Sequence, residues 1–110
     1  MGAFGHETMQ RRRTPRYPFV GGIAELTDSS GQCLLAGTGQ LSRFGCFVRT
    51  PTPLPARATV SLRITYDGRE FAADGEVVYA LPDKGMGLAF RSIPSGHEDV
   101  LEGWLAECAA

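Results

Sequence analysis

Residues 58–80 have the sequence ATVSLRITYDGREFAADGEVVYA, and this stretch decides the fold. Its first part, residues 58–66, alternates apolar side chains with polar ones, which is typical of a strand with one buried face. Asp67-Gly68 then has the composition of a two-residue type I′ hairpin turn. Residues 69–80 are predicted to form the partner strand, with four side chains expected on its apolar face: Phe71, Ala73, Val77 and Tyr79.

Toward the N-terminus, three more strands are predicted, spanning residues 17–27, 32–38 and 44–50. Gly21-Gly22 inside the first of them indicates a bulge or a close approach of two backbone segments. Residues 51–55, PTPLP, contain three prolines and are predicted to be a loop, because proline cannot donate a ladder hydrogen bond.

Toward the C-terminus, residues 86–91 are predicted to be a sixth strand, and residues 96–108 an amphipathic helix. Ser95 and Glu98 have the spacing of a capping box, with Ser95 as the N-cap. The apolar face of the helix has five members at helical spacing: Val100, Leu101, Trp104, Leu105 and Cys108. Six short strands before one helix predict a closed six-stranded antiparallel β-barrel with a C-terminal α-helix, because closure leaves no exposed sheet edge.

The length of 110 residues fits one domain, which we place at residues 11–108 behind a flexible tail of residues 1–10. The net charge of −1 gives no overall attraction to nucleic acid. The charge is uneven, however, because residues 1–20 carry four arginines against Glu7 and the rest of the chain is acidic. A basic arm on an acidic body favours a locally held anionic ligand.

The cysteines argue against a disulfide framework, since three residues without a pairing pattern cannot form one. We expect Cys33, Cys46 and Cys108 to be reduced thiols in or near the core. No apolar run approaches the length of about 20 residues that a membrane helix needs, so we expect no membrane insertion and a cytoplasmic location.

The sequence contains no pattern typical of catalytic or metal-binding residues. Neither His6 nor His97 belongs to a recognised nucleophile pattern, and Ser42 does not lie in a nucleophile elbow. No cysteine or histidine pairs have zinc-ligand spacing. We therefore expect no enzyme activity, no catalytic residues, no metal and no cofactor.

Two motifs remain. Arg12 and Arg16 are separated by three residues, and QLSRFG at residues 40–45 lies at the entry to the predicted third strand. In this order, on a small barrel, they resemble the PilZ domain family, whose signature is R-x-x-x-R followed by [D/N]-x-S-x-x-G. The segment GMGLAF at residues 85–90 and the final helix are also similar, and the resemblance covers residues 10–106.

The resemblance implies a receptor for cyclic di-GMP. Arg12 and Arg16 would bind guanine and phosphate, with Arg11 or Arg13 assisting. Arginine suits both groups, because its guanidinium can bind a phosphate or the O6/N7 edge of guanine through two parallel hydrogen bonds. Ligand binding would order the arm and thereby signal to an effector protein, whose identity the sequence does not reveal.

The second motif implies the rest of the ligand site. Gln40 and Ser42 would contact a guanine, and Gly45 would let the backbone turn or approach closely. Gln40 departs from the family pattern, since the first position is Asp or Asn there. This leaves open a degenerate PilZ adaptor that binds proteins and no nucleotide.

A third interpretation is a small oligonucleotide-binding barrel, with Tyr17, Phe19 and Phe44 as stacking residues. It is disfavoured because the acidic body offers no continuous basic track for a nucleic-acid backbone.

Overall fold

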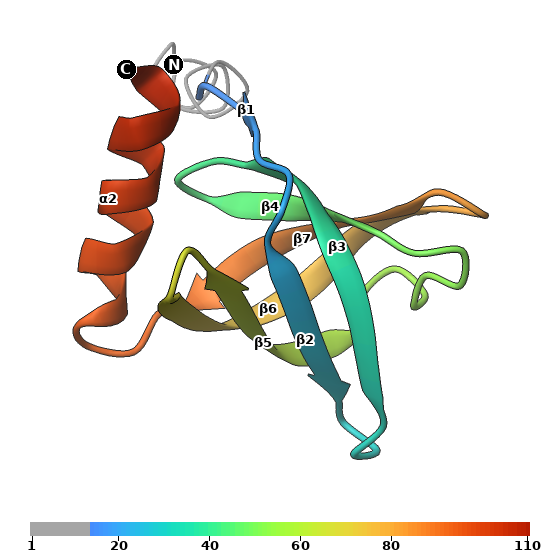
Figure 1. Cartoon of the computed structure of the whole chain (residues 1–110). Helices are drawn as coiled ribbons and strands as arrows, with labels where there is room; N and C mark the ends of the chain where they lie inside the picture. The colour runs from blue at the N-terminus through green and yellow to red at the C-terminus, as the bar shows by residue number, and fades with distance from the viewer. Residues whose placement is uncertain (1–13) are drawn as a thin grey trace, which may run out of the picture.

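The computed structural model describes residues 14–110, so Arg11, Arg12 and Arg13 lie outside the described residues (Figure 1). Within this range the chain forms seven strands followed by one helix. Their bounds are β1 Tyr17–Pro18, β2 Ile23–Asp28, β3 Cys33–Leu41, β4 Gly45–Arg49, β5 Thr59–Tyr66, β6 Arg69–Leu81, β7 Gly85–Ser92 and α2 His97–Ala109.

Strands β2 to β7 close into a six-stranded antiparallel barrel, which confirms the predicted fold. Neighbouring strands follow the order β3-β2-β5-β6-β7-β4, and the pairing of β3 with β4 closes the ring. The two-residue β1 pairs with the end of β3 beyond the residues that pair with β2, and it places Tyr17 opposite Leu41. Figure 1 shows α2 standing beside one end of the barrel.

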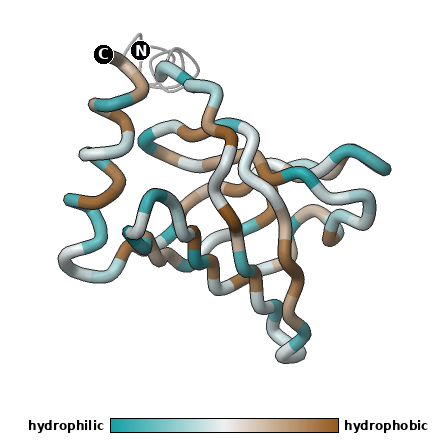
Figure 2. Tube along the Cα trace, viewed as in Figure 1, coloured by the Kyte–Doolittle hydropathy of each residue, from teal (hydrophilic) through white to brown (hydrophobic). Residues whose placement is uncertain are grey.

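The central hairpin is confirmed in detail. Tyr66 pairs with Arg69, and the two residues between them have positive φ angles, 52° at Asp67 and 76° at Gly68. A type I′ turn needs positive φ at both central positions, which explains the Asp-Gly pair. Hydrophobic and hydrophilic residues follow one another along the strands in Figure 2, as a barrel with a filled interior requires.

The predicted first strand is interrupted at Gly21-Gly22 and becomes β1 and β2. Gly21 has a φ of 100°, which takes the chain out of the sheet. Gly22 makes the close approach that the Gly21-Gly22 pair indicated: it lies against Thr38 of β3, and its N–H donates to Thr38 Oγ1 at 3.0 Å. A β-carbon on Gly22 would lie only 2.7 Å from that oxygen. The paired glycines therefore fix where the segment around Arg16 joins the barrel.

An aromatic cluster seals the end of the barrel under α2. Trp104 is 1% exposed, and its ring centroid lies 5.3 Å from that of Phe19 and 5.7 Å from that of Tyr66. Phe71 from β6 completes the cluster at 6.3 Å from Trp104. Because Phe19 directly follows β1, this cluster joins the C-terminal helix to the segment that carries Arg16.

The capping box predicted at Ser95 is wrong. The N-cap is Gly96, with a φ of 92°, and no side chain caps the helix. His97 N–H donates to the carbonyl oxygen of Pro94 at 3.1 Å, so a tight turn satisfies the first amide of α2. The imidazole of His97 is also engaged, since its Nδ1 accepts the Ala72 N–H of β6 at 3.0 Å. The helix start thus docks on β6 beyond the end of β7.

Two further sequence predictions are wrong. Tyr79 does not share the buried face of Phe71 and Val77, because β6 bulges between Val77 and Tyr79 and the tyrosine is 42% exposed. Cys33 is exposed at the start of β3, whereas Cys46 is buried and Cys108 is partly buried.

Between residues 14 and 110, no helix is long and apolar enough to cross a membrane.

Candidate functional site

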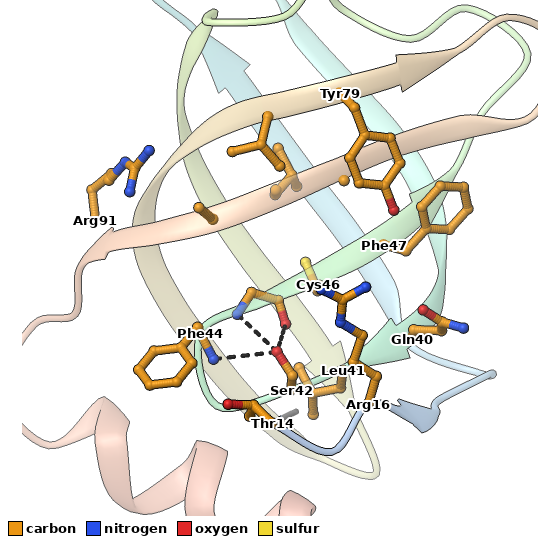
Figure 3. Close-up of a pocket in the computed structure, with 15 residues that line it drawn as sticks. Thr14, Arg16, Gln40, Leu41, Ser42, Phe44, Cys46, Phe47, Tyr79 and Arg91 are labelled. Carbon is orange, nitrogen blue, oxygen red and sulfur yellow. Dashed lines mark hydrogen bonds between the residues drawn. The ribbon is translucent and has the colours of Figure 1, made fainter. Parts of the chain in front are cut away.

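A groove with a volume of about 330 Å³ lies on the outer wall of the barrel. Its lining comes from the segment before β1, from the β3–β4 hairpin, and from parts of β6 and β7 (Figure 3). This volume is at the lower end of the roughly 300–1,000 Å³ typical of small-molecule sites. The groove therefore has room for a small molecule or for part of a larger one.

Small residues form part of the lining. Gly45 of β4 pairs with Ala89 of β7, and Gly87 lies two residues earlier on β7. A β-carbon on Gly45 would collide with the carbonyl oxygen of Leu88. Gly45 is therefore required by the close packing of β4 against β7, and this gives a physical reason for glycine at the end of the QLSRFG motif.

One row of cross-strand neighbours spans four strands of the groove wall. Gln40 pairs with Phe47, Phe47 with Gly87, and Gly87 with Tyr79. Two of these side chains reach the outer wall because of β-bulges, in which Gly39 and Val78 are the extra residues. Each bulge shifts the alternation by one residue, so Gln40 and Tyr79 point outward where an uninterrupted strand would turn them inward.

The rings of Phe47 and Tyr79 stack on this wall. Their centroids are 6.3 Å apart and their planes are inclined by 24°. The Tyr79 ring covers Gly87 so closely that a β-carbon there would lie 2.5 Å from Tyr79 Cζ. Phe47 similarly lies near Gly39, where a β-carbon would be 3.2 Å from its Cδ2. Glycines thus make the space that lets both rings lie on the barrel.

Ser42 organises the hairpin between β3 and β4. Its Oγ accepts the backbone N–H groups of Phe44 and Gly45, each at 3.2 Å, and donates to the carbonyl oxygen of Gly45 at 3.2 Å. The Ser42 N–H donates to the same carbonyl at 2.9 Å. The dashed lines in Figure 3 show these side-chain bonds. The hydroxyl proton is thereby used inside the turn, so the role of Ser42 in this structure is to shape the loop.

Two arginines supply positive charge to the groove. Arg16 is exposed, and among the described residues it forms no ion pair. Figure 3 shows its side chain directed into the groove. Arg91 donates through Nε to Glu76 Oε1 at 2.9 Å, an interaction that leaves its terminal amino groups outside the pair. A groove with an unpaired guanidinium is suited to an anion.

Cys46 also lines the groove but offers no nucleophile. Its thiol is buried, and this desolvation raises its pKa from 9.0 to about 12. The thiol is therefore protonated at neutral pH, and only a thiolate is an effective nucleophile or metal ligand. Within residues 14–110, no three His, Cys, Asp or Glu side chains are grouped so that they could hold a metal ion.

Four of the residues predicted for the cyclic di-GMP site meet at this groove: Arg16, Gln40, Ser42 and Gly45. Phe44, predicted as a stacking residue for an oligonucleotide, also lines it. The stacking surface of the oligonucleotide interpretation does not assemble, because Phe19 is 5% exposed and packs on Trp104.

Sequence reasoning missed Phe47, Tyr79 and Arg91 as groove residues. A usable signal was the alternation of glycine in GMGLAF, since glycine in a strand often marks the close approach of another group.

Comparison with known proteins identifies a family. The family model described as PilZ domain matches residues 10–107. No curated protein matches the chain significantly. Among solved structures, the PilZ domain of CeSA from a cellulose-synthesizing bacterium has a TM-score of 0.67 and 19% identity, covering 88% of this chain and 100% of that one.

Two larger proteins contain the same fold. The K. pneumonia MrkH–c-di-GMP complex has a TM-score of 0.75 and 19% identity, covering 89% of this chain and 51% of that one. The Borreliella burgdorferi PlzA protein in complex with c-di-GMP has a TM-score of 0.65 and 15% identity, covering 94% and 45% respectively. This chain therefore spans about half the length of MrkH or PlzA, and at these identities the likeness shows a common fold.

Proposed function

The chain belongs to the PilZ domain family, and we propose that it is a non-enzymatic receptor for cyclic di-GMP, which binds in the groove on the barrel wall and signals through a partner protein. Its unpaired cysteines fit a reducing compartment, and we place this activity in the cytoplasm.

The observation that carries the proposal is the meeting of two separate motifs in one groove. Arg16 precedes β1, and Gln40 to Gly45 join β3 to β4, yet both segments line the same cavity. The short β1 brings them together, because Pro18 pairs with Gln40. A cyclic dinucleotide has two phosphates and two guanines, and arginine can bind either group through paired hydrogen bonds.

Each residue has a defined part in the proposed site. Arg12 and Arg16 bind guanine and phosphate, with Arg11 or Arg13 assisting. Gln40 is exposed beside Arg16 in the groove lining and offers an amide that can both donate and accept. Because the Ser42 hydroxyl is already engaged with Gly45, we assign Ser42 to holding the loop in shape, with any contact to guanine being secondary.

The aromatic cluster offers a route for the signal. Ligand contact would order the arm up to Arg16, which is joined through β1 to Phe19, and Phe19 packs on Trp104 of α2. Ligand binding would thus affect the packing of the C-terminal helix, and a partner protein can recognise that change. Hydrogen exchange tests this step: amides from Arg11 to Arg16 should exchange quickly in the free protein and slowly with ligand, and equal exchange in both states would contradict it.

Isothermal titration of the full chain with cyclic di-GMP tests the proposed function, with cyclic di-AMP and GTP as controls. Cyclic di-AMP carries the same phosphates but lacks the O6 and N2 groups of guanine. We expect saturable binding of cyclic di-GMP and much weaker binding of both controls. Absence of binding by the folded wild-type protein would contradict the proposal.

A degenerate adaptor remains the second candidate, because Gln40 stands where the family pattern has Asp or Asn. Titration of Gln40→Asn and Gln40→Asp separates the two functions. If the longer side chain alone limits affinity, one or both variants should bind more tightly than wild type. If wild type and both variants all fail to bind, the adaptor function is favoured.

A further inference from the structure

We propose that the ring pair of Phe47 and Tyr79 is a stacking wall that holds a purine base of the bound nucleotide. The inference rests on the proposed function and adds a base-binding element outside the two motifs. Neither Phe47 nor Tyr79 belongs to R-x-x-x-R or to QLSRFG, but both line the same groove as Arg16 and Gln40 (Figure 3).

The first argument is how the rings are presented. The bulge at Val78 turns Tyr79 out of the barrel, leaving it 42% exposed, although the alternation along β6 would otherwise bury it. Aromatic side chains usually contribute to a core, so a strand irregularity that exposes one beside a groove points to a use for the ring. Phe47 is partly buried beside it, with a ring inclined by only 24° to that of Tyr79.

The second argument is that the rings are held in place from below. A β-carbon on Gly87 would lie 2.5 Å from Tyr79 Cζ, and one on Gly85 would lie 2.7 Å from Phe47 Cζ. The glycine backbone of β7 thus supports both rings, which limits the conformational entropy that they lose when a ligand stacks on them. Every base has a planar face, and stacking on a fixed aromatic ring recognises that face.

The third argument is the polar surroundings, which favour a nucleotide over a protein partner. Gln40 is the cross-strand neighbour of Phe47, and Arg16 and Arg91 line the same groove. A concave site with an aromatic wall and a few converging polar groups is typical of a small-molecule site. A base stacked on the wall would place its polar edge near Gln40 and Arg16, whereas Arg91 lies on the opposite side of the groove (Figure 3).

Titration of cyclic di-GMP into wild type, Tyr79→Ala and Tyr79→Phe tests the inference. Leu81→Ala is the matched control, because Leu81 is 43% exposed on the same strand but does not line the groove. Removing one base–aromatic stack typically weakens binding by about fivefold to a hundredfold. We expect such a loss for Tyr79→Ala, with Tyr79→Phe and Leu81→Ala near wild type. Thermal melts establish that each variant is folded.

Nuclear magnetic resonance gives a readout that a purely structural role would not change. A guanine stacked on Tyr79 should show its H8 proton shifted upfield in the wild-type complex and less so with Tyr79→Ala. Wild-type affinity in Tyr79→Ala, without a difference in H8 shift, would overturn the stacking wall and leave the receptor function intact. Loss of affinity in Tyr79→Phe equal to that in Tyr79→Ala would also overturn it, because the hydroxyl would then be the contact. If wild type does not bind, the receptor function fails and the stacking wall fails with it.

Discussion

Gly45 faces the backbone of Leu88 so closely that a β-carbon at residue 45 would collide with the Leu88 carbonyl oxygen. Gly45→Ala should therefore force β4 away from β7 and lower the free energy of unfolding by roughly 1–3 kcal/mol, the usual cost of overpacking. Gly37→Ala is the control, because its β-carbon would meet only the flexible side chain of Arg49, at 3.4 Å from Nη2. Urea denaturation measures both variants, and equal stability would contradict the close packing.

Ser42→Ala should destabilise the β3–β4 hairpin. The N–H groups of Phe44 and Gly45 would lose the oxygen that accepts both of them, at 3.2 Å each. A net loss of about 1 kcal/mol per neutral hydrogen bond is expected, and binding of cyclic di-GMP should weaken less than on loss of an arginine. Ser61→Ala, on the exposed face of β5, should be neutral. A Ser42→Ala protein as stable as Ser61→Ala would rule out the turn role.

Phe19→Ala should be among the most damaging substitutions in the chain. It removes a ring that lies 4.6 Å from Tyr66 and 5.3 Å from Trp104, centroid to centroid. Large-to-small changes of this kind cost about 3–5 kcal/mol. Val20→Ala is the control, since Val20 is 59% exposed. Trp104 is the only tryptophan, so its fluorescence reports unfolding directly. Similar unfolding midpoints for the two variants would show that the cluster contributes little.

The cysteines should differ in reactivity. Burial raises the pKa of Cys46 to about 12, whereas Cys33 is exposed, so a thiol reagent at pH 8 should label Cys33 first and Cys46 only on unfolding. Rapid labelling of Cys46 in a Cys33→Ser, Cys108→Ser protein would contradict its burial.

The raised pKa of Cys46 also has a consequence for stability. Its folded pKa of about 12 exceeds the ordinary value of 9.0, so ionisation begins in the unfolded chain first. The contribution to stability is complete below about pH 9 and is lost as the pH rises toward 12. Cys46→Ala should reduce this part of the alkaline loss, measured as the change in unfolding free energy between pH 7 and pH 10 in a Cys108→Ser background. An unchanged pH dependence would contradict the assignment.

Regular local patterns explain which parts of the fold could be predicted. The Asp67-Gly68 hairpin and the helical spacing around Trp104 are local patterns, and both gave the right element. Patterns of this kind fail at bulges, because an extra residue shifts the alternation without changing composition. Gly39 and Val78 are such residues, so the outward positions of Gln40 and Tyr79 depend on tertiary pairing that no local pattern contains.

The features of the candidate site also divide into those that a sequence pattern identifies and those that depend on the fold. Arg16, Gln40, Ser42 and Gly45 could be selected because they form motifs in the sequence, and they meet in the groove. The engagement of the Ser42 hydroxyl by its own turn could not be foreseen, since it depends on the backbone path of the hairpin. The helix start was mispredicted for a similar reason, because the Gly96 turn and the docking of His97 on Ala72 replace a side-chain cap.

The central claim is that the groove binds cyclic di-GMP through the arginine motif, and calorimetric titration of Arg16→Ala tests it most directly. Arg12→Ala is measured alongside it, and Arg63→Ala is the control because Arg63 pairs with Glu70 and does not line the groove. Each motif arginine should supply charge-assisted hydrogen bonds worth roughly 1.5–3 kcal/mol, so its loss should weaken binding by about tenfold or more. The account predicts this loss in both motif variants, with unchanged melting temperatures and near wild-type affinity in Arg63→Ala. Wild-type affinity in Arg16→Ala and Arg12→Ala would contradict it.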